Sequence, residues 1–383
     1  MHKYCSSVEI TRRSISVLIA LSVLWLSKSY AIQRLDLELV HFGVNRPTLI
    51  KLPEAQWKST IDSMARHGVR LIRTGLVEPT NRVPDLVAYA NGRGIDVLLV
   101  IPLWLPHFYM PETRIRPGNQ AFHRVYPISA IDTTRFTKFW KEHRVQMRRR
   151  GARILGYQVG NEINGAAFNG DYPISRHARL LPLARCDIAE ICDQIQRGFR
   201  VYVDVLRVIR ESGDLDEAAL IASGLVKGSA DWARRNEGYF SSFTQSISYL
   251  ISLGASRYVD AYAVHIYPNL RGKDLTLQLN DVARQVSSLI DECSRADSAR
   301  PACWITEWGV PSKKIGCGTE PMRDAFLRAA FRTIKRQAAT GRVAGAIYYD
   351  WDFDKRLSIY RCDKPLVDLD IVLPFRQNAR LPR

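Results

Sequence analysis

Two stretches of the chain end an apolar run with a glutamate. The first is Tyr157–Asn164, with an Asn–Glu pair at Asn161 and Glu162, and the second is Cys303–Pro311, with Glu307. A short apolar run that stops at an acid is typical of a buried strand whose carboxylate stands at the mouth of a sheet. The two glutamates are 145 positions apart, so only a closed or strongly wound fold can bring them together.

Two facing carboxyl groups could act on one bond. Glycoside hydrolysis needs such a pair, because one carboxyl group must be protonated to donate to the leaving oxygen while the other is ionised to attack the anomeric carbon. Taken alone, each glutamate is more simply explained as a solvated or loop-capping carboxylate. The hypothesis therefore depends on the elements that place Glu162 and Glu307.

Apolar runs and amphipathic stretches alternate from Leu39 onward. The expected strands are Leu39–Asn45, Val69–Leu76, Ile95–Trp104, Ile154–Val159, Ala219–Val226, Tyr262–Tyr267, Ala302–Thr306 and Ala344–Trp351. The expected helices are Pro53–His67, Pro84–Arg93, Thr133–Arg150, Asp187–Glu211, Ser241–Leu253, Leu275–Cys293 and Met322–Thr340. Near-continuous apolar strands suit a parallel sheet that is covered on both faces. Eight such units predict one α/β domain, a (β/α)8 TIM barrel over residues 32–383, whose site lies at the carboxyl ends of the strands. The eighth helix is weak or absent, since residues 364–383 show only a turn near Leu366.

With these elements in place, the chain resembles the clan A glycoside hydrolases, which are retaining (β/α)8 enzymes. Asn161-Glu162 closes the fourth expected strand, and the sequence Thr-Glu-Trp-Gly around Glu307 closes the seventh. The resemblance implies that Glu162 is the acid/base and Glu307 the nucleophile. It covers nearly the whole mature chain in the order of elements, and families 5 and 39 of the clan are both near.

The resemblance also assigns six further residues to substrate binding or to support of the glutamates. Arg73 ends the second strand, where its guanidinium would keep Glu307 ionised. Asn161 would hydrogen-bond the sugar 2-hydroxyl. A His-x-Tyr sequence at the end of the sixth strand would let Tyr267 donate to the nucleophile, although a histidine in an apolar strand is more often a core residue. The full set is Arg73, Asn161, His265, Tyr267, Trp351, as an aromatic floor under the sugar, and Asn45, as a weaker contact.

The first 31 residues are typical of a signal peptide. A basic start with Lys3, Arg12 and Arg13 precedes an apolar core of about 14 residues, which is short of the ~20 that a membrane span needs. Ser29-Tyr30-Ala31 then offers a cleavage site, so the mature protein is expected to be secreted or periplasmic. Retention of this segment as a membrane anchor is the alternative.

Six cysteines remain after cleavage, and an even number in an exported chain suggests disulfides. The local pairings are Cys186–Cys192, Cys293–Cys303 and Cys317–Cys362, with buried free thiols as the alternative. None of them has the paired spacing of a zinc site, and we expect neither a metal nor a cofactor. Asp350, Asp352 and Asp354 resemble the start of a calcium loop, but Lys355 stands where an EF-hand needs glycine.

The net charge of the chain is +17. The first 31 residues hold four basic residues and one acidic residue, so the mature protein carries +14. Such a charge attracts anionic partners; no nucleic-acid motif is present, and an acidic polysaccharide suits an exported protein better. General basicity of the source proteome explains the charge equally well. Two long connections, residues 105–131 and 165–185, carry arginines that could meet uronic acids: Arg114, Arg116, Arg124, Arg176 and Arg179.

Together with these patterns, the resemblance implies a retaining glycoside hydrolase that acts on an oligo- or polysaccharide. The preferred hypothesis is endo action on a bacterial exopolysaccharide. Two alternatives stay open. A transglycosidase would use the same two glutamates and pass the sugar to another acceptor. An inactive carbohydrate-binding barrel would keep the fold without the chemistry, although it would have no need of two opposed carboxylates.

Overall fold

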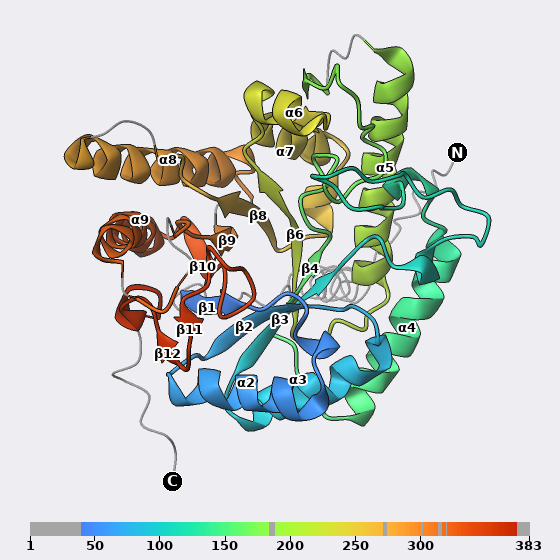
Figure 1. Cartoon of the computed structure of the whole chain (residues 1–383). Helices are drawn as coiled ribbons and strands as arrows, with labels where there is room; N and C mark the ends of the chain where they lie inside the picture. The colour runs from blue at the N-terminus through green and yellow to red at the C-terminus, as the bar shows by residue number, and fades with distance from the viewer. Residues whose placement is uncertain are drawn as a thin grey trace, which may run out of the picture. The chain divides into compact units, whose positions relative to one another are not determined.

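The computed structural model describes residues 40–183, 188–270, 274–299, 302–312, 316–318 and 320–373. Eight parallel strands close into a barrel in the order β1-β10-β9-β8-β6-β4-β3-β2 (Figure 1). They are β1 (His41–Asn45), β2 (Leu71–Gly75), β3 (Asp96–Ile101), β4 (Gly156–Val159), β6 (Ala219–Val226), β8 (Ala261–Ile266), β9 (Cys303–Trp308) and β10 (Val343–Tyr348). The predicted (β/α)8 barrel is confirmed.

Helices surround the barrel, and each buries one face against the strands (Figure 1). They are α2 (Glu54–Arg66), α3 (Val83–Gly92), α4 (Thr133–Arg149), α5 (Ala189–Glu211), α7 (Phe243–Ser252), α8 (Leu275–Ala296) and α9 (Pro321–Ala339). The strands β2, β4, β8, β9 and β10 are buried at every residue. This burial on both faces explains why the sequence shows apolar runs rather than alternation.

Some connections contain more structure than the sequence predicts. Between β6 and α7 lie a short helix, α6 (Ala230–Asn236), and a two-residue strand, β7 (Phe240–Ser241), which pairs with β5 (Leu180–Leu181). Short 3-10 helices fill other loops: η1 (Leu49–Lys51), η2 (Thr80–Arg82), η3 (Pro106–Phe108), η4 (Ile128–Ala130) and η5 (Ala255–Arg257). Ser229 caps α6 through its hydroxyl, which accepts from Trp232 N at 3.1 Å.

The place of an eighth helix is taken by other structure in the described part of the chain. A hairpin of β11 (Tyr360–Arg361) and β12 (Lys364–Pro365) precedes the 3-10 helix η6 (Leu369–Ile371). Arg323 on α9 is buried and donates to the carbonyl oxygens of Val310, Leu357 and Ser358. Its guanidinium therefore ties the loop after β9 to the loop after β10, where a helix would otherwise cover the barrel.

Two predicted disulfides are confirmed, Cys293–Cys303 and Cys317–Cys362. Cys192 is disulfide-bonded as well, while Cys186, its predicted partner, lies outside the described residues. The expected signal peptide also lies outside them. In the described part of the chain, no helix has both the length and the apolar character to span a bilayer.

The Cys317–Cys362 disulfide joins the loop after β9 to the hairpin that replaces the eighth helix. Both cysteines are exposed, so replacing them with serine (C317S/C362S) changes little packing. The bond closes a loop of 45 residues, for which chain entropy gives a stabilisation of about 4 kcal/mol. We expect the double variant to lose up to ~4 kcal/mol of unfolding free energy, measured by urea denaturation. An unchanged denaturation midpoint would show that this bond does not hold the hairpin in place.

Candidate active site

Glu162 follows β4 in a backbone conformation that side chains rarely adopt. Gly160 has a φ of 77° and Glu162 a φ of 47°, so the chain turns sharply after the strand. The Glu162 amide then donates to the carbonyl oxygen of Gly224 on β6 at 2.9 Å. Left-handed backbone at a non-glycine residue costs about 1–2 kcal/mol and is often found at functional sites. Here it aims the carboxylate across the mouth of the barrel.

Glu307 lies within β9, one residue before the strand ends, and both of its oxygens have partners. Oε1 accepts from Arg73 Nη1 at 2.6 Å and from Asn45 Nδ2 at 3.4 Å. Oε2 accepts from the Tyr267 hydroxyl at 2.6 Å. The carboxylate on β9 thus receives hydrogen bonds from residues on or next to three other strands, β1, β2 and β8.

Arg73 connects the two glutamate-bearing segments. Besides Glu307, its guanidinium donates from Nε to Gln158 Oε1 at 2.8 Å and from Nη2 to Asn161 Oδ1 at 2.7 Å. Its side chain is 3% exposed. The guanidinium plane is therefore fixed by three acceptors, which are Gln158, Asn161 and Glu307. The same contacts hold Asn161 next to Glu162.

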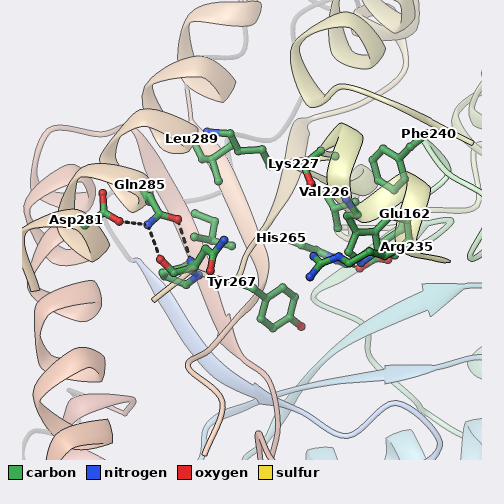
Figure 2. A pocket seen from close by; sticks show the side chains of 16 residues that line it. Glu162, Val226, Lys227, Arg235, Phe240, His265, Tyr267, Asp281, Gln285 and Leu289 are labelled. Atoms are coloured by element: carbon green, nitrogen blue, oxygen red, sulfur yellow. Dashed lines mark hydrogen bonds and ion pairs between the residues drawn. The ribbon is translucent and has the colours of Figure 1, made fainter. Parts of the chain in front are cut away.

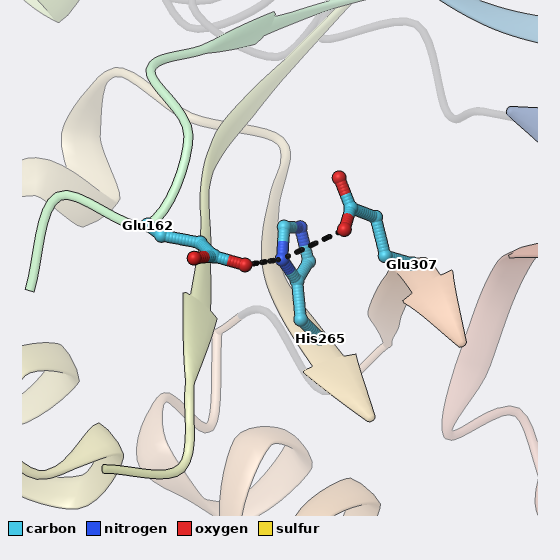
Figure 3. Close-up of side chains that lie close together, drawn as sticks. All are labelled: Glu162, His265 and Glu307. Atoms are coloured by element: carbon cyan, nitrogen blue, oxygen red, sulfur yellow. Dashed lines mark hydrogen bonds and ion pairs between the residues drawn. The ribbon is translucent and has the colours of Figure 1, made fainter. Parts of the chain in front are cut away.

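His265 stands between the two glutamates (Figure 3). Its Nδ1 lies 2.8 Å from Glu162 Oε1 and 3.4 Å from Glu307 Oε2. The ring is held from behind by Gly224, where an added Cβ would come within 2.1 Å of His265 Nε2. A larger residue at position 224 would push the imidazole out of the site.

The two carboxylates are close but differ in their surroundings. One oxygen of each glutamate and one His265 nitrogen lie within 4.8 Å of one another. The Glu162 side chain is 18% exposed, whereas that of Glu307 is 8% exposed. Carboxyl groups about 5–5.5 Å apart are the spacing of retaining glycosidases, and about 6.5–9.5 Å is that of inverting ones. The two carboxylates therefore lie close enough to act on one bond.

The pKa of Glu307 reflects opposing influences. Burial alone would raise it, but the charges of His265 and Arg73, with hydrogen bonds from Tyr267 and Arg73, outweigh burial and hold the pKa below its usual value. Conversely, burial and the adjacent carboxylate raise the pKa of Tyr267 well above its usual value. Glu307 is therefore ionised, and Tyr267 is a hydrogen-bond donor, at neutral pH.

Glu162, His265 and Glu307 are the one group in the described part of the chain with the spacing of metal ligands. The chemistry of the group opposes a metal, however. Arg73 and Tyr267 already engage both oxygens of Glu307, and the guanidinium charge repels a dication. The residues present fit a carboxylate pair better than a metal centre.

The structure brings together most residues that the sequence singles out. Besides the two glutamates, these are Arg73, Asn161, His265, Tyr267 and Asn45. Trp351 is the exception: its ring is 1% exposed and stacks on Tyr360 with centroids 4.7 Å apart. The prediction that it forms a floor under a sugar is wrong, because such a platform must present an open ring face. The strand was expected to run to Trp351, but β10 ends at Tyr348.

Two residues of the site are not singled out by the sequence. Gln158 on β4 accepts from Arg73, but its position in an apolar run gives no chemical signal. Tyr349, directly after β10, is half-buried with its ring 6.2 Å from that of Tyr267, and burial and Glu307 raise its pKa.

The long connections pack mainly on themselves. Tyr109 and Tyr126 stack with centroids 4.2 Å apart, while Phe122 and Tyr172 are buried. Arg116 is used in the same way, since its guanidinium donates to the carbonyl oxygen of Ala166 at 2.5 Å and links the two connections. Four arginines remain exposed on these loops: Arg114, Arg124, Arg176 and Arg179.

A pocket of about 580 Å³ opens beside Glu162 between the ends of β6 and β8 and helices α6 and α8 (Figure 2). Glu162, His265 and Tyr267 form its inner end, and Glu307 is not among its lining residues. This pocket thus adjoins one of the two glutamates, Glu162.

No protein-family model matches the chain, and no curated protein matches it. Similar solved structures do exist. An exo-β-1,4-mannosidase from Opitutaceae bacterium strain TAV5 shares 16% identity at a TM-score of 0.53, over 88% of this chain and 59% of that one. A GH5-4 broad-specificity endoglucanase from an uncultured bacterium shares 12% identity at a TM-score of 0.53, over 88% of this chain and 90% of that one. A glucosidase from Croceicoccus marinus shares 12% identity at a TM-score of 0.50, over 84% of this chain and 64% of that one. The fold is that of these glycosidases. The similarity to clan A glycoside hydrolases is confirmed at the level of the fold, and the chain spans little more than half the length of the mannosidase.

Replacing Tyr267 with phenylalanine should raise the pKa of Glu307, because burial is then opposed by one hydrogen bond fewer. The depressed pKa of Glu307 stabilises the folded state above the unfolded pKa, and this stability is lost as the pH falls through the folded pKa. The variant should therefore lose about 1–3 kcal/mol at neutral pH, with the loss shrinking toward low pH. Urea denaturation between pH 3 and 7 measures it. Tyr202→Phe, which removes a buried tyrosine hydroxyl that donates to the carbonyl oxygen of Val159 at 2.9 Å rather than to a carboxylate, is the matched control; an equal pH dependence in both variants would contradict the assignment.

Divalent metal ions should not bind the carboxylate pair. A metal that bound the folded state would raise the melting temperature with concentration. We expect no shift when Zn²⁺, Mn²⁺ or Ca²⁺ is added up to millimolar levels, and none when EDTA is added to purified protein, by differential scanning fluorimetry. A rise in wild-type protein that Glu307→Gln abolishes would reverse this conclusion.

Proposed function

We propose that the protein is a retaining glycoside hydrolase that cleaves O-glycosidic bonds of an oligo- or polysaccharide by double displacement. The observation that supports this best is the approach of Glu162 and Glu307 within 4.8 Å at the carboxyl ends of the barrel strands. Their different surroundings suit different roles, since one carboxylate is held ionised by Arg73 and the other is more exposed.

In the first step, a Glu307 oxygen attacks the anomeric carbon while the bond to the leaving oxygen breaks. Glu162 gives its proton to that oxygen, and a glycosyl ester of Glu307 forms. In the second step, Glu162 takes a proton from water, the water oxygen bonds to the anomeric carbon, and Glu307 leaves as the carboxylate. Both glutamates return to their starting protonation states, and no cofactor takes part.

The neighbouring residues support these steps. Arg73 and Tyr267 hold Glu307 ionised and oriented, and as the ester forms, their hydrogen bonds must weaken. Asn161, whose Oδ1 accepts from Arg73, is suited to bind the sugar 2-hydroxyl with its amide. His265 Nδ1 lies 2.8 Å from Glu162 Oε1 and 3.4 Å from Glu307 Oε2, so it can hydrogen-bond to either carboxylate.

For the substrate, we propose a polysaccharide, with an acidic bacterial exopolysaccharide and endo action as the finer hypothesis. The net charge of +17 and the exposed arginines on the long connections favour an anionic polymer. The disulfides favour an oxidising compartment, in keeping with cleavage after Ala31 and a secreted or periplasmic protein. The similar structures named for mannosidase, endoglucanase and glucosidase activity make β-mannosides and β-glucosides the first substrates to test.

The test is a panel of 4-nitrophenyl glycosides with Glu162→Gln and Glu307→Gln. We expect wild-type protein to release nitrophenol from at least one of them, with retained configuration at the anomeric carbon by ¹H NMR. Glu307→Gln should lower kcat at least ~10³-fold by loss of the nucleophile. Glu162→Gln should affect this activated leaving group less and a methyl glycoside of the same sugar by about 10²–10⁴-fold.

The outcome also separates the alternatives. If an added sugar acceptor diverts most of the product from hydrolysis to transfer, the protein is a transglycosidase with the same two glutamates. If wild-type protein binds oligosaccharides but cleaves nothing in the panel, the carbohydrate-binding alternative replaces the enzyme. Inversion of configuration would overturn double displacement.

A further inference from the structure

The pocket beside Glu162 contains two cations that no carboxylate neutralises in the described part of the chain. These are Lys227, directly after β6, and Arg235 on α6. The adjacent Arg234 pairs with Asp231 on the same helix, and Arg284 on α8 pairs with Asp281 at 2.5 Å. These two exposed arginines are thus paired with carboxylates, whereas Lys227 and Arg235 line the pocket without such a partner.

The remaining wall of the pocket cannot supply the missing negative charge. Asp281 lines the opposite side (Figure 2), where it accepts from Arg284 and, at 2.8 Å, from Gln285 Nε2. Gln285 is itself held by the backbone of Asn269, at 2.9 Å to its amide and 3.0 Å to its carbonyl oxygen. With Asp281 paired to Arg284, Lys227 and Arg235 are the two lining cations without an ion-pair partner in the described part of the chain, and a concave wall concentrates the field of such charges.

An aromatic wall accompanies the cations. Trp232 on α6 is half-buried, and it meets the rings of Phe240 and Phe122 at centroid distances of 5.3 Å and 5.6 Å. These contacts fix the indole on the same helix that carries Arg235. A rigid aromatic surface beside a cation is suited to a ring with an apolar face and a charged substituent.

The position of the pocket identifies which part of a substrate it receives. On the proposed function, on which this inference rests, Glu162 protonates the leaving oxygen, so the group attached to that oxygen lies against Glu162. The pocket adjoins Glu162 and not Glu307. It therefore receives the leaving sugar, and by microscopic reversibility it receives an acceptor sugar as well.

We propose that Lys227 and Arg235 form a subsite that selects a leaving sugar with an anionic group, a uronic acid carboxylate in the first instance. The subsite places the charge recognition next to the bond that is cleaved. It differs from the arginines of the long connections, which lie outside this pocket. A sulfated sugar offers the same charge in another form, and the test distinguishes the two.

The experiment uses as donor the 4-nitrophenyl glycoside that the enzyme cleaves. Methyl β-D-glucoside, methyl β-D-glucuronide and methyl β-D-glucoside 6-sulfate are added as ligands of the leaving-sugar pocket. We expect the glucuronide to inhibit nitrophenol release with an inhibition constant at least ~10-fold below that of the glucoside. Raising the salt from 50 to 500 mM should reduce this ratio, since exposed charges are screened. A sulfate ester that inhibits better than the glucuronide would assign the subsite to sulfated sugars.

Lys227→Gln with Arg235→Gln should bring the ratio of inhibition constants to within ~2-fold of unity. The control is Arg332→Gln with Lys335→Gln, which removes two exposed cations from α9 outside the pocket and should leave both the ratio and the basal rate unchanged. Melting curves verify that both variants are folded.

Equal inhibition by the glucuronide and the glucoside in wild-type protein would overturn the inference while leaving the hydrolase intact. So would a preference that survives in the Lys227 and Arg235 variant. If no glycoside is cleaved, the proposed function itself fails, and the two failures are thereby distinguished.

Discussion

The buried ion pair between Arg73 and Glu307 is the interaction on which the site depends. Both side chains are almost fully withdrawn from water, and the desolvation of two charges is repaid only when geometry and hydrogen bonding are good. The structure meets this condition with partners from several strands. Gln158 and Asn161 accept the remaining hydrogen bonds of the guanidinium, and Asn45 and Tyr267 donate to the carboxylate. Removing one member would leave an uncompensated buried charge, which costs about 3–5 kcal/mol.

Only a closed barrel can assemble these partners. The register pairs Asn45 with Arg73 on β1 and β2, and His265 with Glu307 on β8 and β9. These pairs lie on neighbouring strands, but Arg73 and Glu307 stand on strands that are separated by β1 and β10 in the barrel order. Their side chains meet across the interior at the carboxyl ends. The polar centre thus links strands that share no backbone hydrogen bonds.

Much of this arrangement could be predicted from the sequence because its signals are local. Apolar runs reveal parallel strands, and a glutamate or an arginine at the end of such a run stands out by type. Gln158 could not be found this way, since its role depends on the position of Arg73 across the interior. Trp351 was misassigned for a related reason. The apolar run continues past the end of β10 into a loop, so the sequence does not reveal that Tyr349 faces the site while Trp351 turns into the core against Tyr360.

The same limit explains why the sequence does not reveal the pocket beside Glu162. Arginines on the long connections were conspicuous because those loops are rich in polar and aromatic residues, yet Arg116 is used to join the loops. Lys227 and Arg235 lie in a segment that was expected to be a plain connection between a strand and a helix. There the chain forms α6, which turns Trp232 and Arg235 toward the space beside Glu162. The two carboxylates thereby have different surroundings. Glu307 is enclosed by the charge and hydrogen bonds of the barrel interior, whereas Glu162 faces a pocket lined by Lys227 and Arg235. The first environment stabilises an ionised carboxylate, as the proposed nucleophile requires. The second leaves the proposed acid/base open to exchange its proton and to meet the charged leaving group that we propose.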